Sequence, residues 1–179
     1  MDNGPVVQVV VTFFALLALI ALATAVALTW FRKGSVVAQV GPAAANLAWL
    51  VAVVATLGSL FLSEVAGFVP CVLCWVQRGF MYPLAIALAF PRLRHSSLTS
   101  WWALIGAGVS VYHYAIEHIP ALAESDFCSP TVPCSFIWVE KFGFVTIPFM
   151  ALCGFLAIAA LLATYRRWHQ GQGTISKGP

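Results

Sequence analysis

Five long apolar runs constrain this chain more than any other feature. They cover residues 6–30, 43–62, 71–90, 98–116 and 144–165, and each approaches the roughly 20 apolar residues that a helix needs to cross a bilayer. Only 8% of the 179 residues are charged, whereas about 25% is usual in a soluble domain. Since the runs are continuous rather than alternating, helices are expected instead of a barrel. The sequence therefore predicts an all-α, multi-pass membrane protein with five spans.

The first run, 6–30, differs from a secretory signal peptide in two respects. It is longer than the apolar part of such a peptide, and no lysine or arginine precedes it. Its nearest basic residues, Arg32 and Lys33, follow it instead. We therefore expect a retained transmembrane helix.

Basic residues gather on one side of the predicted spans. Seven of the nine lysines and arginines follow the first, third or fifth run, and the positive-inside rule places that side in the cytoplasm. All six acidic residues fall on the opposite side. The N-terminus, the segment 63–70 and the loop 117–143 are therefore predicted to face outside, and the C-terminus to be cytoplasmic. The seven basic residues are Arg32, Lys33, Arg92, Arg94, Arg166, Arg167 and Lys177.

Four of the five cysteines fall on the predicted outer side. Cys71 and Cys74 open the third run with two residues between them, and we call them the C-x-x-C pair. Cys128 and Cys134 lie in the loop 117–143 and are called the loop pair. A lone C-x-x-C is compatible with zinc or redox chemistry, but an oxidising exterior favours disulfides.

The C-x-x-C pair is predicted to lie in the first turn of a helix, because Pro70 precedes it. The positive end of the helix dipole favours a thiolate, which is the nucleophile in disulfide exchange. Arg78 follows Cys74 by one helical turn, on the same face. A charged arginine costs roughly 2.5–3.5 kcal/mol at the bilayer centre. Arg78 is therefore either a functional cation, beside a thiolate or a quinone carbonyl, or a side chain that reaches the headgroups.

The loop pair has a different character. Five residues separate Cys128 from Cys134, two of them are prolines, and no basic residue lies nearby. Taken alone, this pattern favours a static disulfide that pins the loop. A four-thiolate zinc site made from both pairs fits the spacing, but the oxidising exterior disfavours it. We expect no bound metal.

The motif C-V-L-C-W-x-Q-R at 71–78, followed by F-M-Y-P at 80–83, resembles the DsbB/BdbC family of membrane disulfide-forming oxidoreductases, although position 76 is a valine where the BdbC branch often has an aromatic residue. The resemblance is closest to the BdbC branch. It continues, in the same order over about residues 48–160, through 58–64, His113-Tyr114, the loop pair and 142–149.

This resemblance implies roles for six residues. The C-x-x-C pair corresponds to the cysteines that hand electrons to a membrane quinone, either menaquinone or ubiquinone. The loop pair corresponds to the cysteines that exchange with an extracytoplasmic thioredoxin-like thiol oxidase of the DsbA/BdbD type. Arg78 and His113 correspond to residues that contribute to the quinone site. The implied activity is that of a thiol:quinone oxidoreductase that supports disulfide formation in exported proteins.

The resemblance also implies a domain organisation. The family core is a four-helix bundle, which corresponds here to 35–168, with 1–34 as an extra N-terminal helix and turn and 169–179 as a cytoplasmic tail. A short amphipathic segment on the membrane surface is expected at 135–142. The implied location is the bacterial cytoplasmic membrane, with lipid as a partner and no role for nucleic acid. The short spacing of the loop pair departs from the Gram-negative pattern, which leaves its route to Cys71 open.

Two other classes remain as alternatives. One is a vitamin K epoxide reductase-like enzyme, which is also linked to quinone and carries a C-x-x-C. The continuation Trp75-x-Gln77-Arg78 and the order of the motifs favour the disulfide-forming family. The other is a non-enzymatic membrane scaffold with structural disulfides, which a partner dithiol would not reduce.

Overall fold

The computed structural model describes residues 4–30, 34–123, 128 and 132–175. Helices account for most of these residues, and their only β-type contact is an isolated bridge between Lys141 and Val145. The prediction of an all-α chain is confirmed. The elements are α1 (Pro5–Trp30), α2 (Gly34–Leu60), the π-helix η1 (Phe61–Val65), α3 (Val72–Ala87), α4 (Pro91–Arg94), α5 (Ser97–His118), α6 (Pro120–Ala123) and α7 (Ile147–Ile175).

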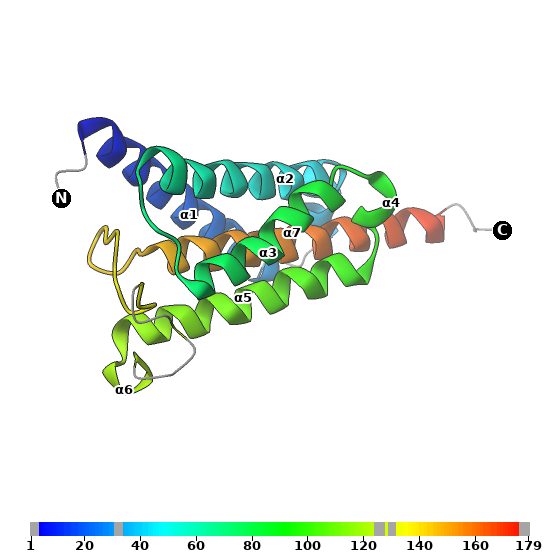
Figure 1. Cartoon of the computed structure of the whole chain (residues 1–179). Coiled ribbons are helices and arrows are strands. Elements are labelled where there is room, and N and C mark those ends of the chain that lie inside the picture. Colours follow the sequence, from blue (N-terminus) through cyan, green and yellow to red (C-terminus); the bar gives the residue numbers. More distant parts are fainter. Residues whose placement is uncertain (1–3, 31–33, 124–127, 129–131, 176–179) are drawn as a thin grey trace.

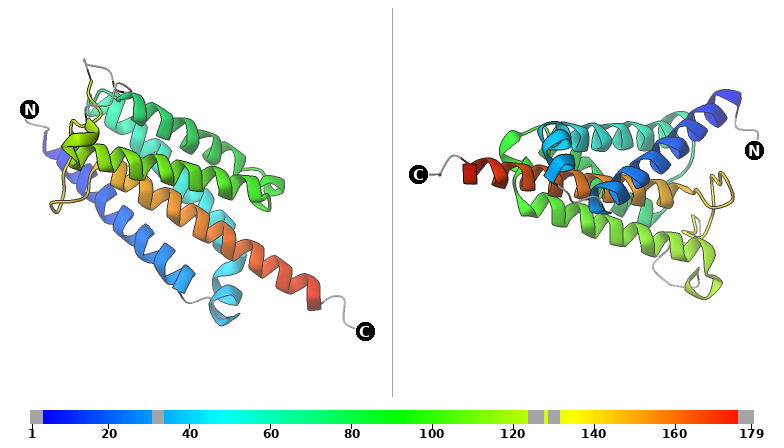
Figure 2. Two further views of the ribbon diagram at one scale, coloured as in Figure 1. Left: turned by 90° about the horizontal axis from the view of Figure 1, so that it is seen from below. Right: turned by 180° about the vertical axis from the view of Figure 1, so that it is seen from behind.

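The longer helices run along the length of the molecule and alternate in direction (Figure 1). The end of α2, the start of α3, α6 and the segment 132–146 lie together at one end, which we call the cysteine end (Figures 1 and 2). The opposite end holds α4 and the end of α7. Arg166 of α7 donates there to the Ser96 carbonyl and the Ser100 hydroxyl, at 3.3 and 2.6 Å.

Three helices are long and apolar enough to cross a membrane, namely Pro5–Trp30, Ser35–Val65 and Ile147–Gln172. The third and fourth predicted runs are also helical, but α3 has 16 residues, about 24 Å at 1.5 Å per residue. Helix α5 carries polar and ionisable side chains such as Ser110 and His113. The membrane class is supported, and the count of five spans stays a prediction.

Several predicted helix boundaries were wrong. Helix α3 ends at Ala87, before Phe90, because the N–H groups of Ala89 and Phe90 bond three residues back instead of four. Helix α7 begins at Ile147 and continues to Ile175, beyond the predicted run 144–165. The run 144–165 covers only the apolar part of this helix. The helix continues into the polar residues that follow, because no proline ends it there.

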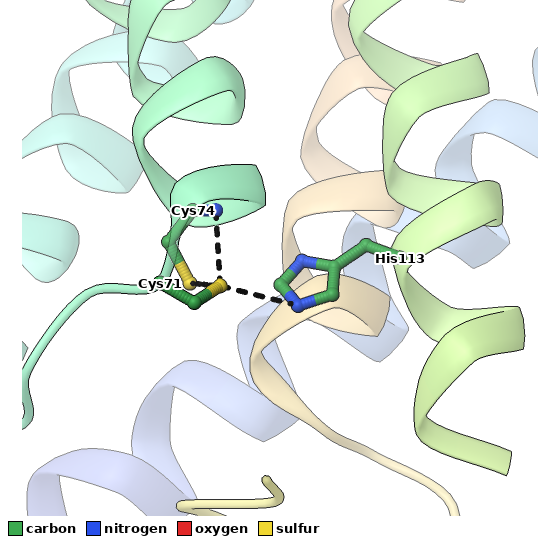
Figure 3. A group of neighbouring side chains, drawn as sticks. All are labelled: Cys71, Cys74 and His113. Carbon is green, nitrogen blue, oxygen red and sulfur yellow. Dashed lines mark hydrogen bonds between the residues drawn. The ribbon is translucent and has the colours of Figure 1, made fainter. Parts of the chain in front are cut away.

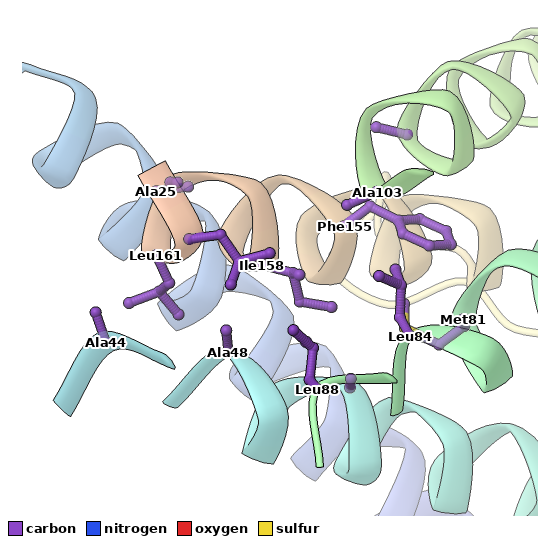
Figure 4. Close-up of a cluster of buried hydrophobic side chains, with 14 of the residues drawn as sticks. Ala25, Ala44, Ala48, Met81, Leu84, Leu88, Ala103, Phe155, Ile158 and Leu161 are labelled. Atoms are coloured by element: carbon purple, nitrogen blue, oxygen red, sulfur yellow. The ribbon is translucent and has the colours of Figure 1, made fainter. Parts of the chain in front are cut away.

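Helix α7 is the centre of the core, because it packs against α1, α2 and α5. Small residues of α2 let the helices approach closely, and larger side chains of α3 and α7 fill the space between them (Figure 4). On α5, Gly106 faces the Phe155 ring, whereas Gly108 faces open space. The labelled core residues are Ala25, Ala44, Ala48, Met81, Leu84, Leu88, Ala103, Phe155, Ile158 and Leu161.

The segment 135–142 packs over the cysteine end as turns and irregular chain rather than as a helix. The Trp138 ring stacks on the Phe68 ring, with centroids 5.3 Å apart. Lys141 Nζ donates to Gln8 Oε1 of α1 at 2.6 Å. This segment therefore ties α1 to the α2–α3 connection.

Candidate functional site: a dithiol between a histidine and an apolar cavity

The C-x-x-C pair lies at the start of α3, as predicted. Cys71 is the N-cap residue, and its Sγ accepts the Cys74 N–H at 3.3 Å. Both side chains are free thiols, with their sulfurs 2.9 Å apart (Figure 3). Since a disulfide bond is about 2.05 Å long, a small side-chain movement is enough to join them. The geometry suits reversible oxidation.

His113 lies against Cys71. Its Nε2 is 3.5 Å from Cys71 Sγ, and the imidazole is almost completely buried on α5 (Figure 3). The other ring nitrogen, Nδ1, lies 3.3 Å from Gln77 Oε1. Which nitrogen carries the proton therefore depends on the orientation of the Gln77 amide.

Ser110 fixes that orientation. Its hydroxyl donates to the Gly106 carbonyl at 2.9 Å, so its oxygen is left to accept from Gln77 Nε2, also at 2.9 Å. The Gln77 oxygen must then face His113, and Nδ1 must donate to it. A neutral His113 consequently presents the lone pair of Nε2 to Cys71. We call Ser110, Gln77 and His113 the hydrogen-bond chain.

Arg78 and Cys74 border an apolar cavity of about 400 Å³, a volume within the range of ligand pockets. The Arg78 guanidinium donates to the Ser59 carbonyl at 3.0 Å and lies over the Trp75 ring, 5.1 Å from its centroid. Among the described residues, Cys71 and His113 are outside this lining. Cys71 thus lies beside His113, whereas Cys74 borders the cavity.

The loop pair forms a disulfide, with Cα atoms 5.8 Å apart. Cys134 is buried in one hydrophobic cluster with Cys71 and Ile116, and the half-buried Cys128 packs against that cluster. The two cysteine pairs are therefore neighbours at the cysteine end. The short spacing of the loop pair therefore allows it to lie in the same cluster as Cys71.

The sulfurs of the C-x-x-C pair and a His113 nitrogen lie within 4.8 Å of one another and form a donor set for zinc. Two thiolates bound to one tetrahedral zinc at 2.3 Å are about 3.8 Å apart, however, which is wider than the observed 2.9 Å. The loop pair is a disulfide, so the described residues do not assemble a four-thiolate site. The geometry favours disulfide chemistry.

Glu117 lies just beyond the fourth apolar run, at the end of α5. Its Oε2 is buried without a hydrogen-bond partner among the described residues. Burial raises the pKa of Glu117, and nearby Thr146, His113 and His118 oppose that effect. Since burial favours the neutral acid, Glu117 adds less negative charge near a Cys71 thiolate than an exposed carboxylate at the same place.

Sequence reasoning missed two members of the site, Gln77 and Ser110. Gln77 stood in the recognised motif without a role, although it shares a helix face with Cys74 at a spacing of three. Ser110 precedes His113 by the same spacing, which also places two side chains on one face. That spacing was the available signal, but the contact between Gln77 and Ser110 depends on how α3 and α5 pack.

Apolar helices with two neighbouring cysteine pairs at one end define a membrane protein with thiol–disulfide chemistry. The model of the family described as disulfide bond formation protein DsbB matches residues 42–165, and the chain belongs to this family. Helix α1 lies outside the matched range.

Curated relatives agree with this assignment. A probable disulfide formation protein C of Bacillus cereus is 49% identical over 116 residues, which are 63% of this chain and 84% of the relative. Disulfide bond formation protein C of Bacillus subtilis is 41% identical over 114 residues, 62% of this chain and 83% of the relative. A probable disulfide formation protein of Metapseudomonas resinovorans is 43% identical over 129 residues, 68% and 88% of the two chains. No solved structure matches the chain.

Proposed function

We propose that this protein is a thiol:quinone oxidoreductase of the bacterial cytoplasmic membrane. It reoxidises an extracytoplasmic thioredoxin-like thiol oxidase and passes the electrons to a membrane quinone. The observation that carries the proposal is the arrangement of the cysteines. The loop disulfide and the C-x-x-C pair share one hydrophobic cluster, and Cys74 also borders the apolar cavity beside Arg78. Membership of the DsbB family supports the same activity.

The proposal includes a topology. Helices α2, α3, α5 and α7 form the four-helix redox domain, α1 is an additional span, and the cysteine end faces outside. The alternating directions of the helices and the basic residues of α4 at the opposite end support this orientation.

The first step is exchange with the reduced partner. Its thiolate attacks Cys128, which is more exposed than the buried Cys134. A mixed disulfide forms, the Cys128–Cys134 bond breaks, and Cys134 leaves as a thiolate beside the C-x-x-C pair. Each such exchange is an attack by a thiolate on a sulfur of a disulfide.

The second step transfers the electrons inward. The Cys134 thiolate attacks Cys71 of the oxidised C-x-x-C pair, and Cys74 leaves as a thiolate at the cavity. The second thiol of the partner then releases Cys128, and the partner leaves oxidised. Cys128 attacks Cys134, which re-forms the loop disulfide and leaves the C-x-x-C pair reduced.

The third step belongs to the cavity, whose apolar lining and polar end suit a quinone. A bound quinone supplies the acceptor for two electrons and two protons. The two thiolates left by the second step close to a disulfide and give up two electrons, and the two protons that the partner dithiol loses balance those that the quinone takes up. His113 Nε2 removes the proton from Cys71 whenever that thiolate has been protonated in between. Arg78 supplies a fixed positive charge beside Cys74, where negative charge passes to the acceptor.

Substitution of either thiol of the C-x-x-C pair tests the proposal. We expect Cys71→Ser and Cys74→Ser to abolish quinone reduction by a reduced thioredoxin-like oxidase, followed by absorbance with purified protein. Cys153→Ser is the control and should stay active, because Cys153 is buried in α7 and belongs neither to the cavity lining nor to the cluster that holds both pairs. Full activity of Cys71→Ser or of Cys74→Ser would contradict the proposed electron transfer. A loop disulfide that resists the partner dithiol would instead indicate a structural scaffold.

Substitution of Arg78 tests the quinone side separately. Loss of a charged hydrogen-bonding group costs about 1.5–3 kcal/mol, so we expect Arg78→Ala to weaken quinone turnover by roughly 10- to 100-fold. Thiol exchange at the loop pair should persist, as measured by trapping of the mixed disulfide. Arg92→Ala at the opposite end should match wild type. An unchanged dependence on quinone concentration would make Arg78 only an interfacial anchor.

A further inference from the structure

Helix α1 contributes one long wall of the cavity. Six of its residues line the cavity, and most recur at the three- and four-residue spacing of a single helix face. Phe13 and Ala23 lie on other faces of α1 and are exposed outside the lining, whereas Ile20 is exposed within it. The lining residues are Phe14, Leu17, Ala18, Ile20, Ala21 and Thr24.

The cavity is elongated, with its polar groups close to one end. Lining residues extend from 14 to 24 on α1, about 15 Å, and from 147 to 161 on α7, about 21 Å. Cys74, Gln77 and Arg78 belong to the first turns of α3, at the cysteine end. Beyond them, the lining toward the opposite end is almost wholly apolar.

The packing of α1 explains why a groove remains. Helix α1 packs along α7 and runs at an angle to α2 (Figure 2). Near the cysteine end the Phe14 ring reaches α2 at Gly58, where an added Cβ would come within 2.8 Å of that ring. The bond between Lys141 and Gln8 holds the same end of α1. Farther along, the space between α1, α2 and α7 belongs to the cavity.

We propose that α1 forms the wall of a groove for the isoprenoid tail of the quinone, whose ring lies at Cys74 and Arg78. This inference rests on the proposed function and adds a substrate determinant to it. A molecule with a compact redox ring and a long apolar tail matches a groove with one polar, redox-active end. In the bilayer the tail is already surrounded by hydrocarbon, so the groove stabilises it through van der Waals contact along α1 rather than through removal of apolar area from water. A quinone without a tail gains none of this contact.

A matched pair of substitutions on α1 tests the groove. Ala21→Phe places a ring in the open space of the lining, whereas Ala23→Phe places the same ring on an exposed face. Each full-length variant is assayed with two quinones that share one ring, one with a long isoprenoid tail and one without. We expect Ala21→Phe to raise KM for the long-tailed quinone about tenfold, with no change for the tail-free quinone. Ala23→Phe should match wild type with both.

A second variant makes a side chain of the groove smaller instead of larger, so it does not crowd the helix. Ile20→Ala removes apolar contact from the groove, and we expect the same selective rise in KM, smaller than that of Ala21→Phe. Circular dichroism and thermal melting confirm the fold of each variant. If Ala21→Phe fails to fold, Ile20→Ala decides the question alone.

The outcomes distinguish a failure of the groove assignment from a failure of the proposed function. Failure of wild type to reduce either quinone removes the proposed function, and the groove assignment falls with it. Normal wild-type turnover with an unchanged KM for the long-tailed quinone in the α1 variants overturns the groove assignment alone. An equal rise in KM for both quinones does the same, since it places the α1 residues at the ring or in general packing.

Discussion

Ser110 is connected to Cys71 through two intervening side chains, Gln77 and His113. Its hydroxyl donates to the Gly106 carbonyl, so its oxygen accepts from the Gln77 amide. The Gln77 oxygen in turn accepts from His113 Nδ1, which determines the tautomer of His113. A general base must present a lone pair to the proton that it removes. In the proposed mechanism, the hydrogen-bond chain therefore directs the Nε2 lone pair of His113 toward Cys71 before any partner binds.

This chain predicts a graded loss of thiol reactivity. In a variant whose only cysteine is Cys71, we expect His113→Leu to slow alkylation by iodoacetamide at neutral pH by at least about tenfold. Ser110→Ala leaves the base in place but frees the Gln77 amide, and one hydrogen bond of about 0.5–1.5 kcal/mol corresponds to a roughly 2- to 10-fold slower reaction.

His118→Leu is the matched control for this series. His118 lies on the same helix, but its side chain is exposed and its Nδ1 contacts the Tyr114 carbonyl at 3.0 Å. Its rate should equal that of the parent variant. Equal rates in all four proteins would show that the hydrogen-bond chain is structural only.

Residue chemistry was the part of the site most accessible from the sequence. The two cysteine pairs and Arg78 followed from spacing and from the family motif, and the start of α3 lies where Pro70 indicated. The contact of His113 with Cys71 was not accessible, because residues 42 apart meet only through the packing of α3 on α5. The closeness of Cys134 to Cys71 likewise depends on how the loop folds back over the helix ends.

At the scale of elements, two glycines of α5 have opposite surroundings. A Cβ at Gly106 would run into the Phe155 ring of α7, whereas a Cβ at Gly108 would meet nothing within 4 Å. We expect Gly106→Ala to destabilise the protein by about 1–3 kcal/mol through overpacking. Gly108→Ala should be neutral or stabilising by up to about 1 kcal/mol, since alanine is the better helix former.

Thermal unfolding in one detergent measures both glycine variants under the same conditions. A melting temperature for Gly106→Ala equal to that of Gly108→Ala would mean that α5 and α7 are farther apart than the structure shows. Of the two glycines, only Gly106 lies where a side chain of a neighbouring helix comes close. Apolar runs locate helices, but they do not show which face of a helix meets its neighbour.

At the scale of the whole molecule, the proposed topology predicts which residues face outside. We expect a cysteine introduced at Glu140, in an otherwise cysteine-free chain, to react with a membrane-impermeant maleimide in intact cells. A cysteine at Ser97, near α4, should react only after permeabilisation. Both positions are exposed and suit labelling. Labelling of Ser97→Cys in intact cells would reverse the orientation or change the number of spans.

The cluster that Cys134 shares with Cys71 has a kinetic consequence. Exchange between the two pairs is intramolecular, and neighbouring groups in fixed geometry react at effective concentrations far above those of any dissolved thiol. In the proposed cycle, small thiols in the surroundings therefore compete with the partner at Cys128 but not with the exchange between Cys134 and Cys71. Under that proposal, each partner molecule that is oxidised delivers its electron pair to the membrane without loss to the medium on the way.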